Sequence, residues 1–223
     1  MNGDRQTPGR SALRRWWDAR VYPLVVDRVC GTHAIMDERQ RWVPRARGRV
    51  LEIGLGSGLN LPLLTAPAVT EIVGIDPSPP LLARAAVRAQ RANQPVALLA
   101  GVAEQLPFEA ARFDTVVFTY TLCSVDQPAV ALAEARRVLR PGGQLIFVEH
   151  GASPHAGLRR WQRRITPVWK RLAGNCHLDR DVPGLLAAAG FTITAMDDRR
   201  DERTSPMSFA YSGVATLDPG PTT

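Results

Sequence analysis

The chain has few cysteines and no long apolar run. Its three cysteines, Cys30, Cys123 and Cys176, show neither the pair spacing of a disulfide framework nor the spacing of metal ligands. We therefore expect reduced thiols and no bound metal. No stretch approaches the roughly 20 uninterrupted apolar residues of a membrane span, and the polar first residues lack the apolar region of a signal peptide. These absences predict a cytoplasmic protein without a disulfide scaffold.

Lysine is nearly absent, because all but one of the 28 basic residues are arginine and the exception is Lys170. The formal net charge of +7 is unevenly distributed: residues 1–49 carry +6, residues 153–178 carry +6, and the remainder carries −5. Basic charge thus belongs to two accessory segments, and no aromatic and basic recognition module is legible, which disfavours nucleic acid as a partner. Peripheral membrane contact through these segments stays open, as does a simple bias of genome composition toward arginine.

A glycine-rich turn follows the first predicted strand. With 223 residues and 45% hydrophobic content, the chain suits one domain with a sizeable core, and residues 50–53 form an apolar strand within it. The strand contains the acid Glu52 and leads into Gly54, Gly56 and Gly58. Glycine has no Cβ, so the backbone can turn sharply and a ligand can lie against it. Residues 59–64 are expected to begin a helix whose unpaired N–H groups face that ligand.

Further strands and helices follow in alternation. Residues 71–76 predict a second buried strand that ends in Asp76, whose carboxylate can accept both ribose hydroxyls of an adenosine. After Pro77 we expect a helix over residues 81–91, a short strand over residues 96–99 and a fourth strand over residues 113–119, with Thr119 at its end. The last predicted elements are a helix over residues 179–189 and strands over residues 191–196 and 207–216.

The spacing of these signals resembles one family. The turn reads Gly-x-Gly-x-Gly, not the dinucleotide pattern Gly-x-Gly-x-x-Gly. Residues 138–148, with Pro141-Gly142-Gly143, resemble the helix end, turn and fifth strand of class I S-adenosylmethionine (SAM) methyltransferases. The resemblance implies an α/β fold with a seven-stranded, doubly wound, mostly parallel sheet. It also implies SAM as cofactor, S-adenosylhomocysteine as product, and cofactor contacts from Glu52, Gly54, Gly56, Gly58, Asp76, Pro77, Ala103, Glu104 and Thr119.

The second half of the chain has a more specific resemblance. Residues 121–125, the pair Glu149-His150 and residues 174–178 are similar to the thiol methyltransferases of the methyltransferase-like family. That resemblance implies S-methylation of a small, largely apolar acceptor, with His150 and His177 as bases or orienting groups. Either histidine can instead be bonded to backbone and play no catalytic part. The residues expected to line the acceptor are Tyr22, Cys123, Trp161 and Trp169.

Two segments are expected to flank this core. Residues 1–49 predict a helical cap in three pieces: a first helix capped by Ser11 and carrying Leu13, Trp16 and Trp17, a second from Tyr22 to Val29, and a third from Ala34 to Val43. The animal thiol methyltransferases carry a hydrophobic membrane anchor where this chain has the basic cap. Residues 153–178 predict a helical lid that Pro167 kinks or restarts, with one apolar stripe formed by Leu158, Trp161, Ile165, Trp169 and Leu172.

Other activities stay open at this point. The same core would serve O- or C-methylation of a quinone, a lipid or a natural-product intermediate. A nicotinamide-dependent oxidoreductase is a different class that shares the glycine-rich turn. The common Tyr-x-x-x-Lys pair of such enzymes cannot occur here, because Lys170 is the only lysine and position 166 is threonine.

Overall fold

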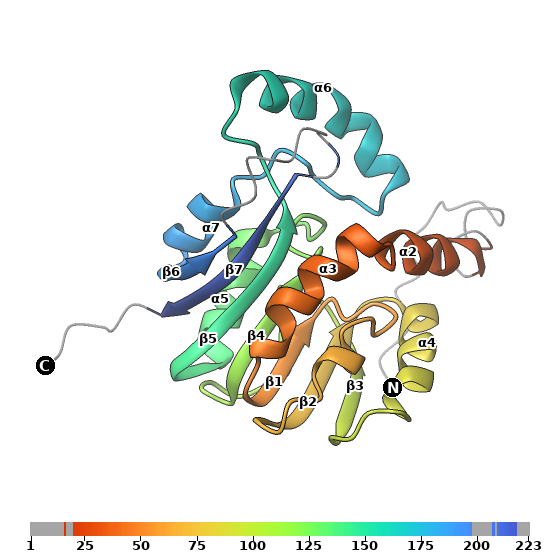
Figure 1. Cartoon of the computed structure of the whole chain (residues 1–223), viewed down its shortest axis with the longest axis vertical. Helices are drawn as coiled ribbons and strands as arrows, with labels where there is room; N and C mark the ends of the chain where they lie inside the picture. The colour runs from red at the N-terminus through yellow and green to blue at the C-terminus, as the bar shows by residue number, and fades with distance from the viewer. Residues whose placement is uncertain (1–15, 17–19, 198–206, 208, 218–223) are drawn as a thin grey trace, which may run out of the picture.

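The fold is a seven-stranded sheet covered by helices on both faces (Figure 1). The computed structural model describes Trp16, residues 20–197, Met207 and residues 209–217, without the side chain of Tyr22. The strand order is β3-β2-β1-β4-β5-β7-β6, and β7 runs antiparallel to the other six strands. The strands are β1 (Gly48–Ile53), β2 (Val69–Asp76), β3 (Val96–Ala100), β4 (Phe113–Thr119), β5 (Leu139–His150), β6 (Phe191–Met196) and β7 (Ala210–Leu217). This confirms the predicted fold class.

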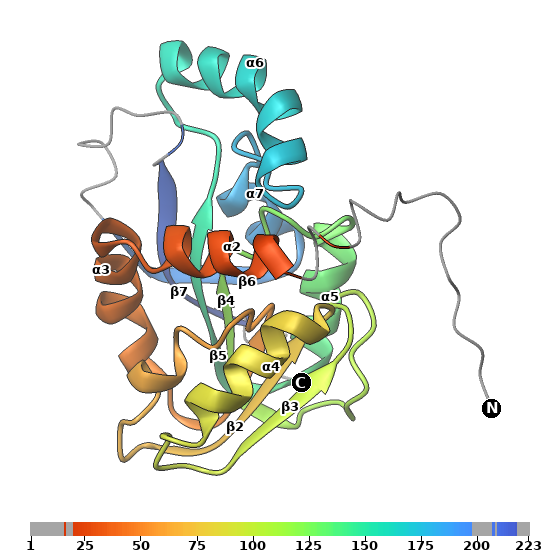
Figure 2. The ribbon, with the colours of Figure 1, turned by 90° about the vertical axis from the view of Figure 1, so that its right-hand side faces the viewer.

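The central strands are buried on both faces because helices cover each side of the sheet. Along β1, Leu51 and Ile53 point into one apolar cluster, whereas Val50 points into a second cluster on the opposite face. Helices α5 (Pro128–Val138) and α7 (Val182–Ala188) pack on the first face. Helices α3 (His33–Trp42) and α4 (Pro79–Ala89) pack on the second. Figure 2 shows the sheet edge-on between these layers.

The sheet order reverses between β1 and β4, since β2 and β3 lie on one side of β1 and β4 and β5 on the other. In open α/β sheets, ligands bind outside the carboxyl ends of the strands at such a reversal. Here that edge lies below α6 (Ala156–Leu172) and beside α2 (Tyr22–Cys30) (Figures 1 and 2). The fold therefore predicts a ligand-binding site at the carboxyl ends of β1, β2 and β4.

The helix predicted over residues 59–64 is not formed, and this prediction was wrong. Only a single 3₁₀ turn, η3 (Leu61–Leu63), forms there, with Pro62 inside it. Asn60 and Leu61 accept the hydrogen bonds of this turn at short sequence separation, and β2 begins soon afterwards at Val69. Because no α-helix starts behind the glycines, the N–H groups that face a ligand must come from the loop itself.

The cap is attached to the domain through α2 and α3, whose bounds agree closely with the second and third predicted helices. A second 3₁₀ turn, η2 (Val43–Arg45), leads from α3 into β1. On α2, Asp27 forms ion pairs of 2.7 Å with Arg84 and 2.9 Å with Arg88, and accepts a hydrogen bond from Ser57. These cations and the Ser57 hydroxyl outweigh the effect of burial and lower the pKa of Asp27 to about 2. Most of the expected first helix, with Ser11, Leu13 and Trp17, lies outside the described residues.

The lid is one helix, α6, which continues through Pro167 and bends along its length (Figure 1). The predicted stripe is confirmed in part, because Leu158, Ile165 and Trp169 pack against buried clusters. Trp161 and Leu172 are 59% and 74% exposed, whereas Gln162 and Thr166 are buried. Gln162 accepts a hydrogen bond from the Ser153 N–H and donates one to the Gly151 carbonyl. This polar side chain therefore occupies the inner face of α6, and the adjacent Trp161 lies on the outer face. Within the described residues, no helix combines the length and apolar character that crossing a membrane requires.

Candidate cofactor and acceptor site

A cavity of about 650 Å³ opens at the carboxyl ends of β1, β2 and β4. Seven of the nine residues predicted to contact the cofactor line it: Gly54, Gly56, Asp76, Pro77, Ala103, Glu104 and Thr119. The wall also takes Arg39 from the cap, Tyr120 and Ser124 from the segment after β4, and Asn175 from the segment after the lid. Segments far apart in the sequence thus enclose one space of the size typical for a small-molecule site.

Asp76 is held in place by the glycine turn. Its Oδ2 accepts a hydrogen bond of 2.8 Å from the Gly56 N–H, and its Oδ1 accepts one of 2.8 Å from the Ser78 N–H. Burial nevertheless raises the pKa of Asp76, although these two donors oppose the rise. The carboxylate is oriented before any ligand binds, which suits an acceptor for ribose hydroxyls.

The three glycines of the turn have different tasks. All have positive φ, which L-residues with a side chain rarely adopt. A Cβ at Gly54 would collide with Thr121, and one at Gly58 would lie 3.2 Å from atoms of Ala85 on α4. A Cβ at Gly56 would meet no protein atom within 4 Å. Gly56 therefore leaves open the space that a ligand would occupy, whereas Gly54 and Gly58 allow the loop to pack.

Glu52 lies beneath the cavity and does not line its wall. Its Oε1 accepts a hydrogen bond of 2.8 Å from the Asn60 amide, while its Oε2 is buried without a partner. Burial raises the pKa of Glu52 to about 8, against the opposing influence of Arg39 and Asn60. The acid that stands two residues before the glycines is thus largely protonated at neutral pH and supports the loop from below.

Arg39 is a site residue that the sequence analysis did not find. It comes from α3, is 5% exposed, and donates from Nη1 to Asn60 Oδ1 at 2.8 Å and to Thr119 Oγ1 at 2.7 Å. Its guanidinium lies 5.4 Å from the centroid of the Tyr120 ring. One of many arginines in a basic cap gives no local signal, so only the fold distinguishes it. It places a positive charge on the cavity wall.

On the acceptor side, the segment after β4 is fixed by a buried carboxylate. Glu149 on β5 accepts backbone hydrogen bonds from Thr121, Leu122 and Cys123, at 2.8, 2.9 and 3.1 Å. The turn starts at Tyr120, whose φ of 55° is unusual for a residue with a side chain. Such local strain persists where surrounding contacts enforce it. The three N–H donors to Glu149 supply that enforcement at the cavity wall.

Behind this wall the structure gathers two thiols and an imidazole. Cys123 and Cys176 are buried with their Sγ atoms 3.5 Å apart, and His150 Nδ1 lies 3.4 Å from Cys176 Sγ and 4.0 Å from Cys123 Sγ. Trp169 of the lid packs against this cluster. The neighbouring Cys176 thiol and burial raise the pKa of Cys123 well above its usual range. All three cysteines of the chain are free, as expected.

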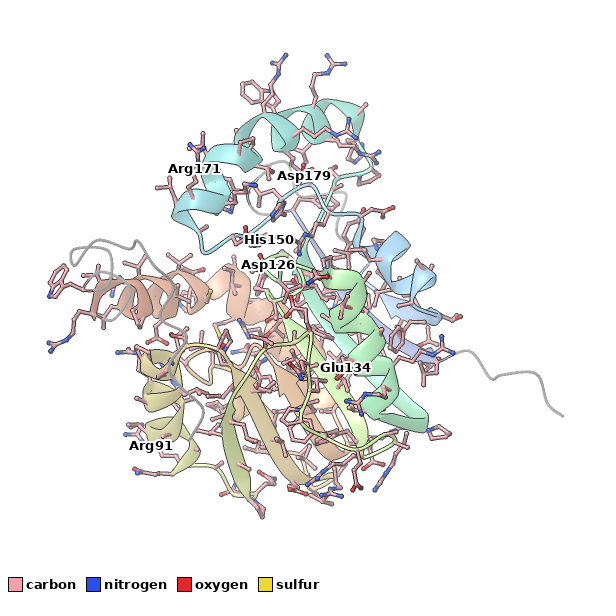
Figure 3. All side chains as sticks on the ribbon, turned by 180° about the vertical axis from the view of Figure 1, so that it is seen from behind. Arg91, Asp126, Glu134, His150, Arg171 and Asp179 are labelled. Carbon is pink, nitrogen blue, oxygen red and sulfur yellow. The ribbon has the colours of Figure 1, made fainter. Side chains whose placement is uncertain are left out.

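The other predicted acceptor residues are more scattered. His177 follows the cluster, and burial together with Arg180 and Lys170 lowers the pKa of its imidazole. Neither His150 nor His177 lines the cavity, and the same holds for Cys123 and Trp169, which lie behind it. Trp161 is on the outer surface of α6, and the side chain of Tyr22 is outside the described residues. Figure 3 shows His150 at the end of β5, below the lid.

A glycine turn open to a cavity, an oriented carboxylate after β2 and a reversal of strand order define a Rossmann-like protein that binds an adenosine-containing cofactor. Residues 51–147 match the family model described as a methyltransferase domain. Human thiol S-methyltransferase TMT1B is 33% identical over 68% of this chain and 64% of its own length. Demethylmenaquinone methyltransferase of Thermus thermophilus is 31% identical over 67% of this chain and 76% of that protein.

Solved structures agree on the fold. A putative methyltransferase of Bacillus halodurans has a TM-score of 0.62 at 21% identity, covering 83% of this chain and 96% of that one. The PH0226 protein of Pyrococcus horikoshii has a TM-score of 0.63 at 20% identity, covering 94% and 100%. The chain belongs to the class I SAM-dependent methyltransferases, and SAM is its cofactor. Its alignments with the thiol S-methyltransferases span less than two thirds of their length.

The different tasks of Gly56 and Gly58 can be separated by substitution. Each alanine variant costs roughly 1–2 kcal/mol from the left-handed backbone, and Gly58→Ala adds a clash with Ala85. We expect Gly58→Ala to unfold at lower urea concentration than Gly56→Ala. We expect Gly56→Ala to lose more SAM affinity, because its methyl group projects into the cavity. Urea titration and calorimetry with SAM measure the two effects, and the reverse ranking on either would contradict these assignments.

Burial of Glu52 should make the free energy of unfolding depend on pH. Its folded pKa of about 8 exceeds the ordinary value of 4.5, so between these values only the folded state holds the proton. The free energy of unfolding must then fall as pH rises through this window, by up to about 1.4 kcal/mol per pH unit. Glu52→Gln removes the contribution while keeping an acceptor for Asn60. Urea titrations from pH 5 to 8 should give a shallower decline for the variant, and parallel curves would contradict the assignment.

Proposed function

We propose that the protein transfers the methyl group of SAM to the thiol of a small, largely apolar acceptor. The observation that carries the proposal is the cluster of Cys123, His150 and Cys176 beside the cofactor cavity. Each member lies in a segment that resembles the thiol methyltransferases, and TMT1B relatives are described as thiol S-methyltransferases. The bound cofactor supplies a methyl group on a positively charged sulfonium, so the protein's own task is to position a sulfur nucleophile.

On the cofactor side, we assign the ribose hydroxyls to Asp76 and the adenine edge to Ala103 and Glu104. Glu104 Oε1 accepts from the Gln127 N–H at 3.2 Å, which holds this acid at the wall. Arg39 suits the carboxylate at the amino-acid end of the cofactor, because its positive charge lies at the cavity wall. This assignment would place the methyl group toward Thr119 and Tyr120.

On the acceptor side, a thiol with an ordinary pKa near 8.5 is about a few per cent thiolate at neutral pH. A positive environment raises that fraction. Arg180 is partly buried and donates to the carbonyls of Leu122 and Val125 in the turn after β4. Burial lowers the pKa of His177, which favours the neutral imidazole that a base requires, and a role as base would need its ring to reach the cavity from behind the wall. The basic lid α6 and the cap would close this space from water.

C-methylation of a quinone is the second candidate. It is favoured by the match to demethylmenaquinone methyltransferase, which covers 76% of that relative and also includes 67% of this chain. A quinol acceptor would need no thiol-binding cluster, and its ring carbon would take the methyl group in the same cavity. Exposed Trp161, Val168 and Leu172 on the outer face of the basic α6 would then suit contact with a membrane that holds such a lipid.

Acceptor competition distinguishes these candidates. With labelled SAM, an equimolar mixture of an alkanethiol and a soluble demethylated quinol should yield labelled thioether as the main product, identified by mass spectrometry. Labelled quinone with no thioether would contradict the proposal.

The cofactor assignment is tested by Asp76→Asn, which should weaken SAM binding by about 1–3 kcal/mol, because the amide is a poorer acceptor for ribose hydroxyls. NAD should not raise the melting temperature, whereas SAM at a hundredfold excess over Kd should stabilise the fold by about 2.7 kcal/mol.

A further inference from the structure

We propose that Cys123, His150 and Cys176 bind one zinc ion. Three potential ligand atoms, two Sγ and one Nδ1, all lie within 4.8 Å of one another. The sequence spacing gave no hint of this, because the three residues are 27 and 26 positions apart and come from the segment after β4, from β5 and from the segment after the lid. Two thiolates and an imidazole are the donor set that tetrahedral zinc prefers.

The distances suit such an ion. Zinc bonds of about 2.3 Å to sulfur and about 2.0–2.1 Å to nitrogen, at tetrahedral angles, place two sulfurs about 3.8 Å apart and sulfur and nitrogen about 3.6 Å apart. The corresponding distances here are 3.5 Å between the sulfurs and 3.4 and 4.0 Å from Nδ1 to the sulfurs. The donor atoms are therefore already spaced to take up the ion with small side-chain adjustments.

One backbone and one side-chain hydrogen bond hold the donors in place independently of the thiols. The His177 N–H donates to the Cys123 carbonyl at 2.7 Å, and the Asn175 amide donates to the Ser124 carbonyl at 2.8 Å. These bonds join the two segments that carry the cysteines. Glu149 fixes the Cys123 N–H from below. Such outer contacts orient metal ligands and contribute to affinity.

The site has an open fourth position, since three protein ligands leave tetrahedral zinc one ligand short. Each ligand adjoins the cavity wall: Ser124 follows Cys123, Asn175 precedes Cys176, and the His150 ring lies 4.7 Å from that of Tyr120. Ser124, Asn175 and Tyr120 all line the cavity. These three residues separate the ion from the cavity, so an acceptor in the cavity reaches the fourth position when one of their side chains moves aside.

A thiol is the acceptor that this position would bind, an inference that rests on the proposed function. The two cysteine thiols lose their protons to solvent, and the resulting thiolates neutralise the zinc ion. The ion then takes the acceptor as thiolate with loss of one more proton. The acceptor sulfur donates an electron pair to the methyl carbon of SAM. The bond from that carbon to the sulfonium breaks, and its electrons stay on the departing sulfur. The thioether formed is a weaker ligand than the thiolate and leaves.

The direct test is metal binding by the full chain, freed of metal by a chelator and kept reduced with a phosphine. Zinc competition against a chromophoric chelator should give one ion per chain for the wild type. Cys123→Ser and Cys176→Ser should each weaken binding at least about 100-fold, beyond the 10–100-fold typical of outer-shell changes. Cys30→Ser is the matched control, because Cys30 lies outside the cluster, and it should bind like the wild type.

Cobalt replaces zinc as the optical probe. Its complex should show thiolate-to-cobalt charge-transfer absorption that both cluster variants lose, and 1-propanethiol should change the spectrum as it becomes the fourth ligand. SAM-induced melting shifts verify that each variant is folded, and His150→Gln provides a third variant. Less than one ion per chain, equal weakening by Cys30→Ser, or formation of a Cys123–Cys176 disulfide without zinc binding would overturn the site.

The metal and the methylation are separable. Full methylation of 1-propanethiol by metal-free protein would overturn the role of zinc and leave the proposed S-methylation intact. One zinc per chain with a spectral response to the thiol, but no thioether product, would support the site and contradict the proposed function.

Discussion

The guanidinium of Arg39 is the contact on which the cofactor site depends. It reaches from α3 of the cap into the ends of the sheet and donates to Asn60 and Thr119, two side chains that stand on either side of the glycine turn. Asn60 in turn donates to Glu52 beneath the turn. A buried charge is tolerated only where such partners are supplied. The cap is therefore not an appendage to the domain, because one of its side chains completes the wall of the cavity.

A buried charged side chain also positions the loop on the acceptor side, where that side chain is Glu149. It fixes three successive N–H groups of the turn after β4 and so determines where Cys123 and Ser124 lie. The lid then brings Cys176 onto this turn through backbone hydrogen bonds. Cofactor and acceptor sides thus share a wall that includes Thr119, Tyr120 and Thr121.

Local signals were enough to predict much of this. The apolar strands, the glycine turn and Asp76 are each legible within a few residues, and strands β4 and β6 match their predicted bounds. Arg39 and the cluster of thiols depend instead on contacts between distant segments, which no local pattern encodes. The predicted lid stripe was correct for Leu158, Ile165 and Trp169. It was wrong for Trp161 and Leu172, because the two buried hydrogen bonds of Gln162 turn a polar side chain inward. The helix after the glycines was wrong because Pro62 sits in a single 3₁₀ turn.

The measurement that tests this account most directly is calorimetric titration of SAM into Arg39→Lys. Lysine keeps the charge but cannot reproduce the planar fork that reaches Asn60 and Thr119. The account predicts affinity at least about tenfold weaker, equivalent to about 1.4 kcal/mol. Arg41→Lys is the matched control on the same helix, since Arg41 pairs with Asp197, and it should bind SAM like the wild type. Equal affinity of wild type and Arg39→Lys would contradict the central role of this contact.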